Sequence, residues 1–178
     1  QIALLQKIAM QLPFQYKIYV KEHPTMVGWR LKSDYHKIAK IPNLKIIDPN
    51  VNGKIIVSNS KGVITVNGTT GWEAILLKKP VLLIGDAFYR KLPMVRYIQD
   101  LDFIKDELDW LFNDYKHIEE ELIKFTASII EKSFELPFEY FWGVTDDEMV
   151  FKKLDKLDNI TINIANEIKE SLKLKHEK

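Results

Sequence analysis

Gly68-Thr69-Thr70-Gly71 stands between an apolar run that ends at Val66 and a helical pattern that begins near Thr70. The first amides of a helix have no partner within the helix, and the helix dipole places partial positive charge there. Glycine lets a bound group approach the backbone, and threonine hydroxyls add donors without adding charge. These residues predict a cradle for a phosphate or diphosphate. A plain N-cap, with Thr69 or Thr70 as the capping residue, explains the same pattern.

Glu73 lies about one turn into this helix, among apolar residues. A carboxylate accepts hydrogen bonds at two oxygens, so it matches the vicinal hydroxyls of a ribose or a sugar. Thr70 and Glu73 also have the spacing of a capping box, in which the glutamate serves only the end of the helix. The sequence therefore leaves two roles open for this carboxylate, ligand binding and helix capping.

His23-Pro24 follows an apolar, β-branched segment that is typical of a strand, and the proline ends that strand. A histidine with an ordinary pKa of about 6.5 can donate to a phosphate or transfer a proton. A histidine that is satisfied by its own loop explains the same residue. The position matters because open α/β sheets bind ligands at the carboxyl ends of their parallel strands.

Composition excludes several other classes of site. The chain has no cysteine, which excludes disulfides, thiolate zinc sites and cysteine nucleophiles. No histidine pair has metal-ligand spacing, and Asp146-Asp147-Glu148 is typical of a solvated acidic turn, so no metal site is expected. The formal net charge of +1 argues against nucleic acid as a partner. No apolar run reaches the roughly 20 residues of a membrane span.

The elements that must position these residues alternate between strand and helix. Two unbroken apolar runs, 63–66 and 81–84, are typical of parallel strands that are covered on both faces. We therefore expect an α/β fold with a Rossmann-like, doubly wound parallel sheet and C-terminal helices. The expected strands are 15–20, 44–48, 62–66, 81–85 and an edge strand at 94–98; the expected helices are 2–12, 33–40 (capped by Ser33 or Asp34), 50–60, 71–79, 102–113 and 117–132.

The whole chain, 1–178, is expected to form one domain, in which 133–178 adds a covering loop and a terminal helix. An aromatic segment at 134–142 would form the loop. Ile160, Ile164, Ile168 and Leu172 repeat at i, i+4 spacing, which predicts one apolar stripe on the helix. The chain opens at Gln1 in mid-helix pattern, so we expect it to be a fragment of a longer protein.

The order of "KEHP", "IPNLKIIDP" and "SKGVITVNGTTGWEAILLKKPVLLIGDAFY" resembles the capsule polysaccharide biosynthesis family, whose bacterial capsule and lipopolysaccharide proteins include Kdo transferases. The resemblance covers roughly Tyr19–Asn113. It implies a metal-independent GT-B glycosyltransferase, built from two Rossmann-like domains with a cleft between them. This chain would be the C-terminal, nucleotide-sugar-binding domain, inactive when isolated.

The resemblance also implies roles for individual residues. His23 and Glu73 would be catalytic, with the histidine on the donor phosphate and the glutamate on ribose or sugar hydroxyls. The other donor-binding residues would be Pro24, Gly68, Thr69, Thr70, Gly71 and Tyr89. The donor would be a nucleotide sugar, with a CMP-linked sugar as one candidate, and no cofactor is expected. A polysaccharide or glycolipid acceptor would bind the absent N-terminal domain. The full protein would be cytoplasmic, with peripheral association at the inner face of the membrane.

Three positions depart from the family pattern: Trp72, Lys78, where a glycine is more usual, and Asp86. Two other functions remain open. One is a CDP-alditol glycerophosphotransferase of teichoic-acid type, which also uses a GT-B donor half. The other is a non-catalytic module for polysaccharide export or assembly, in which donor binding is lost.

Overall fold

The computed structural model describes residues 2–133. The chain divides into two compact units, Gln1–Ile123 and Lys124–Lys178. The aromatic segment 134–142 and the terminal helix with its stripe from Ile160 to Leu172 lie outside the described residues, so both remain predictions. The candidate site residues all belong to the first unit.

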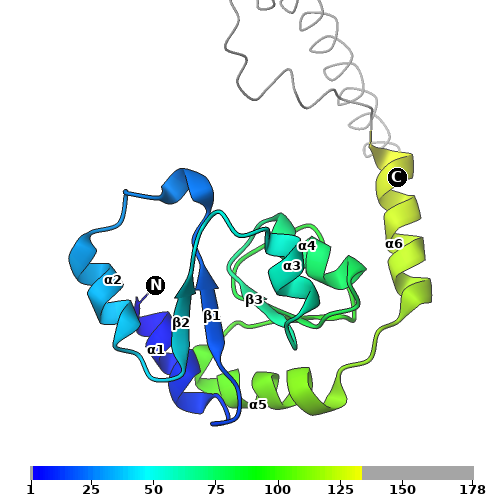
Figure 1. Ribbon diagram of the computed structural model, residues 1–178. Helices are drawn as coiled ribbons and strands as arrows, with labels where there is room; N and C mark the ends of the chain where they lie inside the picture. The colour runs from blue at the N-terminus through cyan, green and yellow to red at the C-terminus, as the bar shows by residue number, and fades with distance from the viewer. Residues whose placement is uncertain (1, 134–178) are drawn as a thin grey trace, which may run out of the picture. The chain divides into compact units, whose positions relative to one another are not determined.

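Five short parallel strands form the centre of the first unit, in two sheets (Figure 1). Strand β1 (Ile18–Lys21) pairs with β2 (Leu44–Ile47), with Ile18 opposite Leu44. Strands β3 (Val63–Thr65), β4 (Val81–Leu83) and β5 (Val95–Tyr97) form the second sheet in the order β3-β4-β5. The expected α/β class with parallel strands is confirmed, and the arrangement is compatible with a Rossmann-like fold.

Helices connect these strands, as parallel pairing requires. Figure 1 shows α1 and α2 beside the β1–β2 pair and α3 and α4 beside β3. The α-helices are α1 Ile2–Gln11, α2 Lys32–Ala39, α3 Gly53–Ser58, α4 Thr69–Leu76, α5 Ile104–Asp109 and α6 Glu119–Lys132; shorter helical segments are η1 Pro24–Met26, η2 Leu101–Phe103 and the π-helical η3 Trp110–Asp114.

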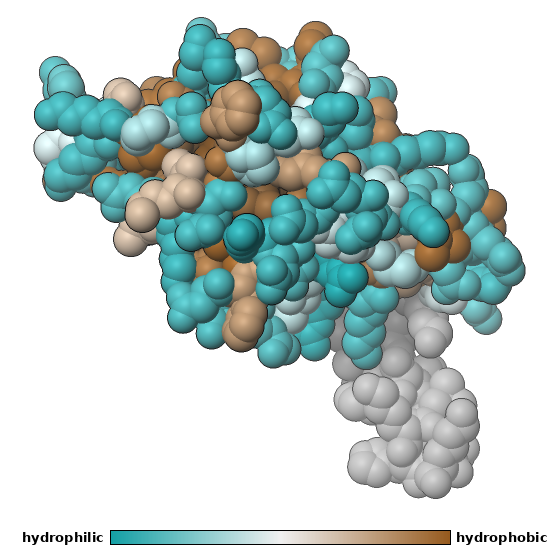
Figure 2. All heavy atoms as spheres, turned by 90° about the horizontal axis from the view of Figure 1, so that it is seen from below, coloured by the Kyte–Doolittle hydropathy of each residue, from teal (hydrophilic) through white to brown (hydrophobic). Residues whose placement is uncertain are grey.

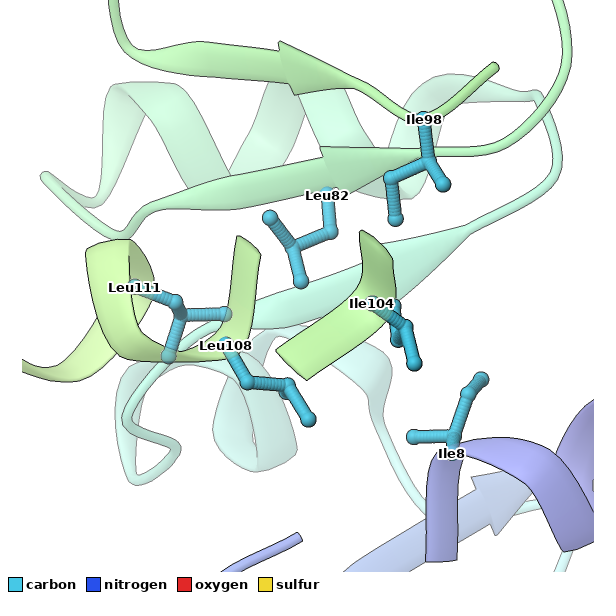
Figure 3. Close-up of a cluster of buried hydrophobic side chains, with 6 residues drawn as sticks. All are labelled: Ile8, Leu82, Ile98, Ile104, Leu108 and Leu111. Atoms are coloured by element: carbon cyan, nitrogen blue, oxygen red, sulfur yellow. The ribbon is translucent and has the colours of Figure 1, made fainter. Parts of the chain in front are cut away.

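A single continuous sheet was expected, whereas the strands form two small ones. No ladder joins β1 to β3; instead the two sheets share a hydrophobic core. Ile8 of α1 and Leu82 of β4 belong to one buried cluster, against which Ile18 and Ile64 pack. Figure 3 shows the buried side chains of this cluster, which come from α1, β4, the segment after β5, and α5 with η3. Side-chain packing rather than strand pairing therefore joins the two sheets.

Burial differs between the two strands that were expected to be covered on both faces. In β4, Val81, Leu82 and Leu83 are each fully buried, which confirms the prediction. In β3, Val63–Thr65 are only partly buried, so the prediction is wrong there. The difference follows from position, because β4 is the middle strand of its sheet and β3 is an end strand. Figure 2 shows that apolar side chains also reach the surface between hydrophilic ones on one face.

Helix α2 begins one residue earlier than its sequence predicts. Ser33 and Asp34 were expected to cap it, but the N-cap is Leu31, without a side-chain hydrogen bond. Asp34 lies in the first turn, where its charge still favours the positive end of the helix dipole.

Helix α4 ends in a left-handed turn that glycine usually makes. Lys78 has φ +59°, and its N–H donates to the carbonyl of Ile75 while that of Lys79 donates to Ala74. These two bonds form a Schellman motif, in which the left-handed residue is most often glycine. The side chain of Lys78 lies 2.6 Å from a carboxylate oxygen of Glu119, and both side chains are largely exposed. Lys78, which stands where the family pattern more usually has a glycine, therefore has a strained backbone conformation and forms a surface ion pair.

Replacing Lys78 with glycine should raise the free energy of unfolding by about 1 kcal/mol, because left-handed backbone costs non-glycine residues about 1–2 kcal/mol and exposed ion pairs add little. Urea unfolding would measure the change. Lys79→Gly is the matched control and should lower stability, since its backbone is not left-handed. Equal losses in both variants would mean that the ion pair outweighs the strain.

Candidate functional site

The loop after β3 turns at Gly68, which is the N-cap of α4. Gly68 has φ +98° and ψ 177°, a region that is essentially restricted to glycine. No side chain forms a capping hydrogen bond there. Thr69 and Thr70 lie inside the first turn, so the expectation that either one caps the helix is wrong. The first-turn amides therefore have no side-chain cap, and both threonines are exposed beside them.

Glu73 lies beyond the reach of a capping box, because Gly68, and not Thr70, is the N-cap. A capping box joins the N-cap to the third helical residue, which here is Gly71. The alternative of helix capping for Glu73 is thus wrong. Its side chain is exposed. The carboxylate can accept hydrogen bonds from a ligand without the desolvation of a buried charge.

Tyr89 supports this loop from within the fold. It is fully buried, and its hydroxyl donates to the carbonyl of Gly68 at 2.7 Å. A Cβ atom at Gly71 would lie 2.3 Å from the same hydroxyl oxygen. Burial raises the pKa of Tyr89, so the hydroxyl stays protonated as a donor. The family resemblance implies that Tyr89 and Gly71 contact the donor; in this structure they pack against each other, and Tyr89 also binds the carbonyl of Gly68.

Two aromatic residues that the sequence did not assign to the site lie next to Tyr89. The ring centroids of Trp72 and Phe88 are 5.4 Å apart, and Phe88 meets Tyr89 edge-on at 5.0 Å. Phe88 keeps 58% of its surface exposed. The position of Trp72, one of the departures from the family pattern, is thus part of an aromatic cluster beside the loop.

Gly85 brings the ends of β3 and β4 together. Its N–H donates to the carbonyl of Val66 at 2.7 Å, and a Cβ atom would lie 2.3 Å from that carbonyl oxygen. The close approach requires glycine, because the neighbouring atom belongs to the backbone. The contact fixes the backbone at Val66, just before the N-cap Gly68, relative to the segment after β4 that carries Tyr89.

His23 lies at the carboxyl end of β1, in the other sheet. It is exposed and is the N-cap of η1, with Nδ1 accepting from the N–H of Thr25 at 3.3 Å. A neutral ring that accepts at Nδ1 carries its proton at Nε2. The ring can therefore donate from Nε2. Pro24, the first residue of η1, is exposed as well.

The turn that carries His23 is tied down by its neighbour Glu22, whose side chain is only 13% exposed. Glu22 accepts hydrogen bonds from the hydroxyl of Tyr35 and, at 3.1 Å, from Nε of Arg30. The bond from Tyr35 is the main reason that the pKa of Glu22 lies below its ordinary value, and Arg30 lowers it further. The sequence offered no signal for this contact, because Tyr35 is thirteen residues away.

Direct contacts thus join Gly68, Gly71 and Tyr89, with Thr69, Thr70 and Glu73 exposed on the same helix. His23 and Pro24 belong to the end of β1. Among residues 2–133 no group of three or more His, Asp or Glu side chains could hold a metal ion. Within the same range, the helices are all too short or too polar to cross a membrane.

Comparison with known proteins assigns the part of the chain that contains the candidate site to a family. A family model described as "Capsule polysaccharide biosynthesis protein" matches residues 2–95, more than half of the chain and all of the candidate site residues. Protein FixF of Sinorhizobium fredii is 35% identical over 86 residues, which cover 46% of this chain and 17% of FixF. No solved structure matches. The chain is therefore a member of the capsule polysaccharide biosynthesis family.

Proposed function

We propose that the chain is the donor-binding domain of a GT-B glycosyltransferase in the synthesis of a surface polysaccharide. The observation that carries the proposal is the start of α4: a glycine N-cap, first-turn amides without a side-chain cap, and an exposed glutamate one turn further on. Family membership supports the class of process.

The chemistry follows from these groups. The amides after Gly68 and the hydroxyls of Thr69 and Thr70 would bind the diphosphate or phosphate of a nucleotide sugar. The same donors would stabilise the negative charge that grows on the leaving phosphate as the glycosidic bond breaks. Glu73 would accept hydrogen bonds from ribose or sugar hydroxyls. His23 would donate from Nε2 to a donor phosphate, and Pro24 would hold its turn.

The acceptor in this proposal is a polysaccharide or glycolipid that binds another part of the full protein. The chain aligns with only 17% of FixF, so the complete reaction is assigned to a longer protein. The isolated chain would bind donor without turning it over. The proposal uses no metal ion, because the amides and hydroxyls already supply the contacts to phosphate.

Glu73→Gln should weaken the binding of the nucleotide sugar about 10- to 100-fold, because a hydrogen bond to a charged group contributes about 1.5–3 kcal/mol. Calorimetric titration with CMP-, UDP- and GDP-linked sugars and with CDP-alditols would measure this. Glu131→Gln, which removes the same charge from an exposed site on α6, is the control and should leave affinity unchanged.

Three results would contradict the proposal. Equal affinity of the Glu73 and Glu131 variants would remove Glu73 from the site. Binding of CDP-alditols alone would indicate a glycerophosphotransferase. A chain that binds no nucleotide donor at all would indicate an assembly module.

A further inference from the structure

Two aromatic side chains lie beside the glycine-threonine loop, on the elements that follow β3 and β4. Trp72 belongs to α4 and Phe88 to the segment after β4, and the planes of their rings are inclined by 53°. Trp72 is half-buried, whereas Phe88 is largely exposed. An aromatic ring gains free energy when it leaves water, so this exposed surface favours the binding of an apolar or aromatic group. We call Trp72 and Phe88 the aromatic pair.

Tyr89 fixes the aromatic pair relative to the loop. Its ring centroid lies 5.0 Å from that of Phe88 and 6.4 Å from that of Trp72. Its hydroxyl binds the carbonyl of Gly68, so one buried side chain separates the aromatic pair from the N-cap of α4. The pentose of a nucleotide separates its phosphate from its base by a similar span. A phosphate on the first amides of α4 would therefore carry its base toward the aromatic pair.

We propose that the aromatic pair binds the nucleobase of the donor by stacking, an inference that rests on the proposed function. Every nucleobase has flat π faces, and an aromatic side chain on which a base stacks adds substantially to affinity. The groups also follow the order of a nucleotide: the amides after Gly68 for phosphate, Glu73 for ribose, and the adjoining Trp72 with Phe88 for the base. Because Trp72 departs from the family pattern, this pair is a feature of the chain itself.

The charges next to Phe88 favour an uncharged, flat occupant. Asp86 and Arg90, two residues before and after Phe88, form an ion pair at 3.0 Å. The guanidinium of Arg90 also lies 5.5 Å from the ring centroid of Tyr97. Since these two charges offset each other, the aromatic surface rather than a net charge is what this segment offers to a ligand.

Calorimetric titration of the 178-residue chain with CMP, UDP, GDP and ribose 5-phosphate, which lacks a base, tests this inference. Phe88→Leu keeps an apolar side chain but removes the ring, so it should weaken the binding of the best nucleotide about tenfold. Ribose 5-phosphate should bind more weakly than that nucleotide, and the substitution should not weaken it further. Phe88→Tyr keeps the ring and should retain the affinity for the nucleotide within about twofold.

The matched control is Phe14→Leu, which makes the same change elsewhere on the surface. Phe14 is 89% exposed and precedes β1, whereas His23 follows that strand. This variant should bind every ligand as the unaltered chain does. Thermal unfolding would check that both leucine variants remain folded, which is expected because both side chains are largely exposed.

Tryptophan fluorescence gives a second readout. A base stacked on Trp72 should quench its emission. Trp72→Phe keeps an aromatic ring, so it should bind the nucleotide within about threefold of the unaltered chain but lose most of the nucleotide-dependent quenching.

The outcomes separate this inference from the proposed function. If the chain binds no nucleotide, both fail. If nucleotides bind and Phe88→Leu binds them as tightly as the unaltered chain, only the stacking inference is overturned. It is also overturned if Phe88→Leu weakens a UDP-linked sugar but not UDP, since the ring would then contact the sugar. Unchanged quenching in Trp72→Phe would overturn it as well.

Discussion

Gly85→Ala should lower the free energy of unfolding by about 3 kcal/mol, at the upper end of the usual cost of overpacking. An alanine Cβ would lie 2.3 Å from the carbonyl oxygen of Val66. That oxygen cannot move aside as a side chain would, because it belongs to the backbone and accepts the N–H of Gly85 itself. The ends of β3 and β4 would therefore have to separate. Urea or thermal unfolding would measure the loss.

Gly53→Ala is the control for this substitution. A Cβ at Gly53 would have no atom within 4 Å, and the residue is the first of α3, after the N-cap Asn52. Alanine there should raise stability by about 0.4–1 kcal/mol, because it restricts the unfolded chain. If Gly85→Ala were as stable as the unaltered chain, or more stable, as Gly53→Ala is expected to be, the ends of β3 and β4 would separate without cost.

Gly71→Ala should have the second largest effect, a loss of about 2–3 kcal/mol. The added Cβ would lie 2.3 Å from the hydroxyl oxygen of Tyr89 and 2.7 Å from Cζ. Tyr89 is fully buried, so its ring has no open space to enter. Moving it would also break its hydrogen bond to the carbonyl of Gly68. Because that bond holds the N-cap of α4, any donor affinity should fall together with stability.

Tyr89→Phe separates the steric overlap with the new methyl group from the loss of the hydrogen bond to Gly68. Alone, this substitution should lower the free energy of unfolding by about 1 kcal/mol, because the hydrogen bond is lost. Combined with Gly71→Ala, it removes the atom nearest to the new methyl group, so the double variant should be more stable than the sum of the single losses predicts. Calorimetric unfolding of the four proteins would give the coupling. Strictly additive losses would mean that the methyl group does not meet the hydroxyl.

The sequence predicted most of the elements around the site, because their signals are local. Apolar runs indicated β3 and β4, and alternation of strands with helices indicated parallel pairing. The burial of β3 was overestimated, since an apolar run does not reveal whether a strand is in the middle or at the end of its sheet. The division into two sheets also depends on packing between distant segments.

The details of the site were harder to predict, because contacts far apart in sequence fix them. Local preference favours a threonine cap, but Tyr89, twenty-one residues beyond Gly68, binds the carbonyl of that glycine. Likewise, nothing in "KEHP" indicates that Tyr35 and Arg30 surround Glu22. The sequence therefore predicted which residues form the candidate site, but not the distant residues whose hydrogen bonds hold them in place.

The bond between Tyr89 and Gly68 has a practical consequence for engineering. A graft of the glycine-threonine segment into another scaffold would arrive without the phenol that anchors it. Transplantation should succeed only when residues 66–71 and 85–89 travel as a pair, and libraries that diversify one stretch should co-vary the other.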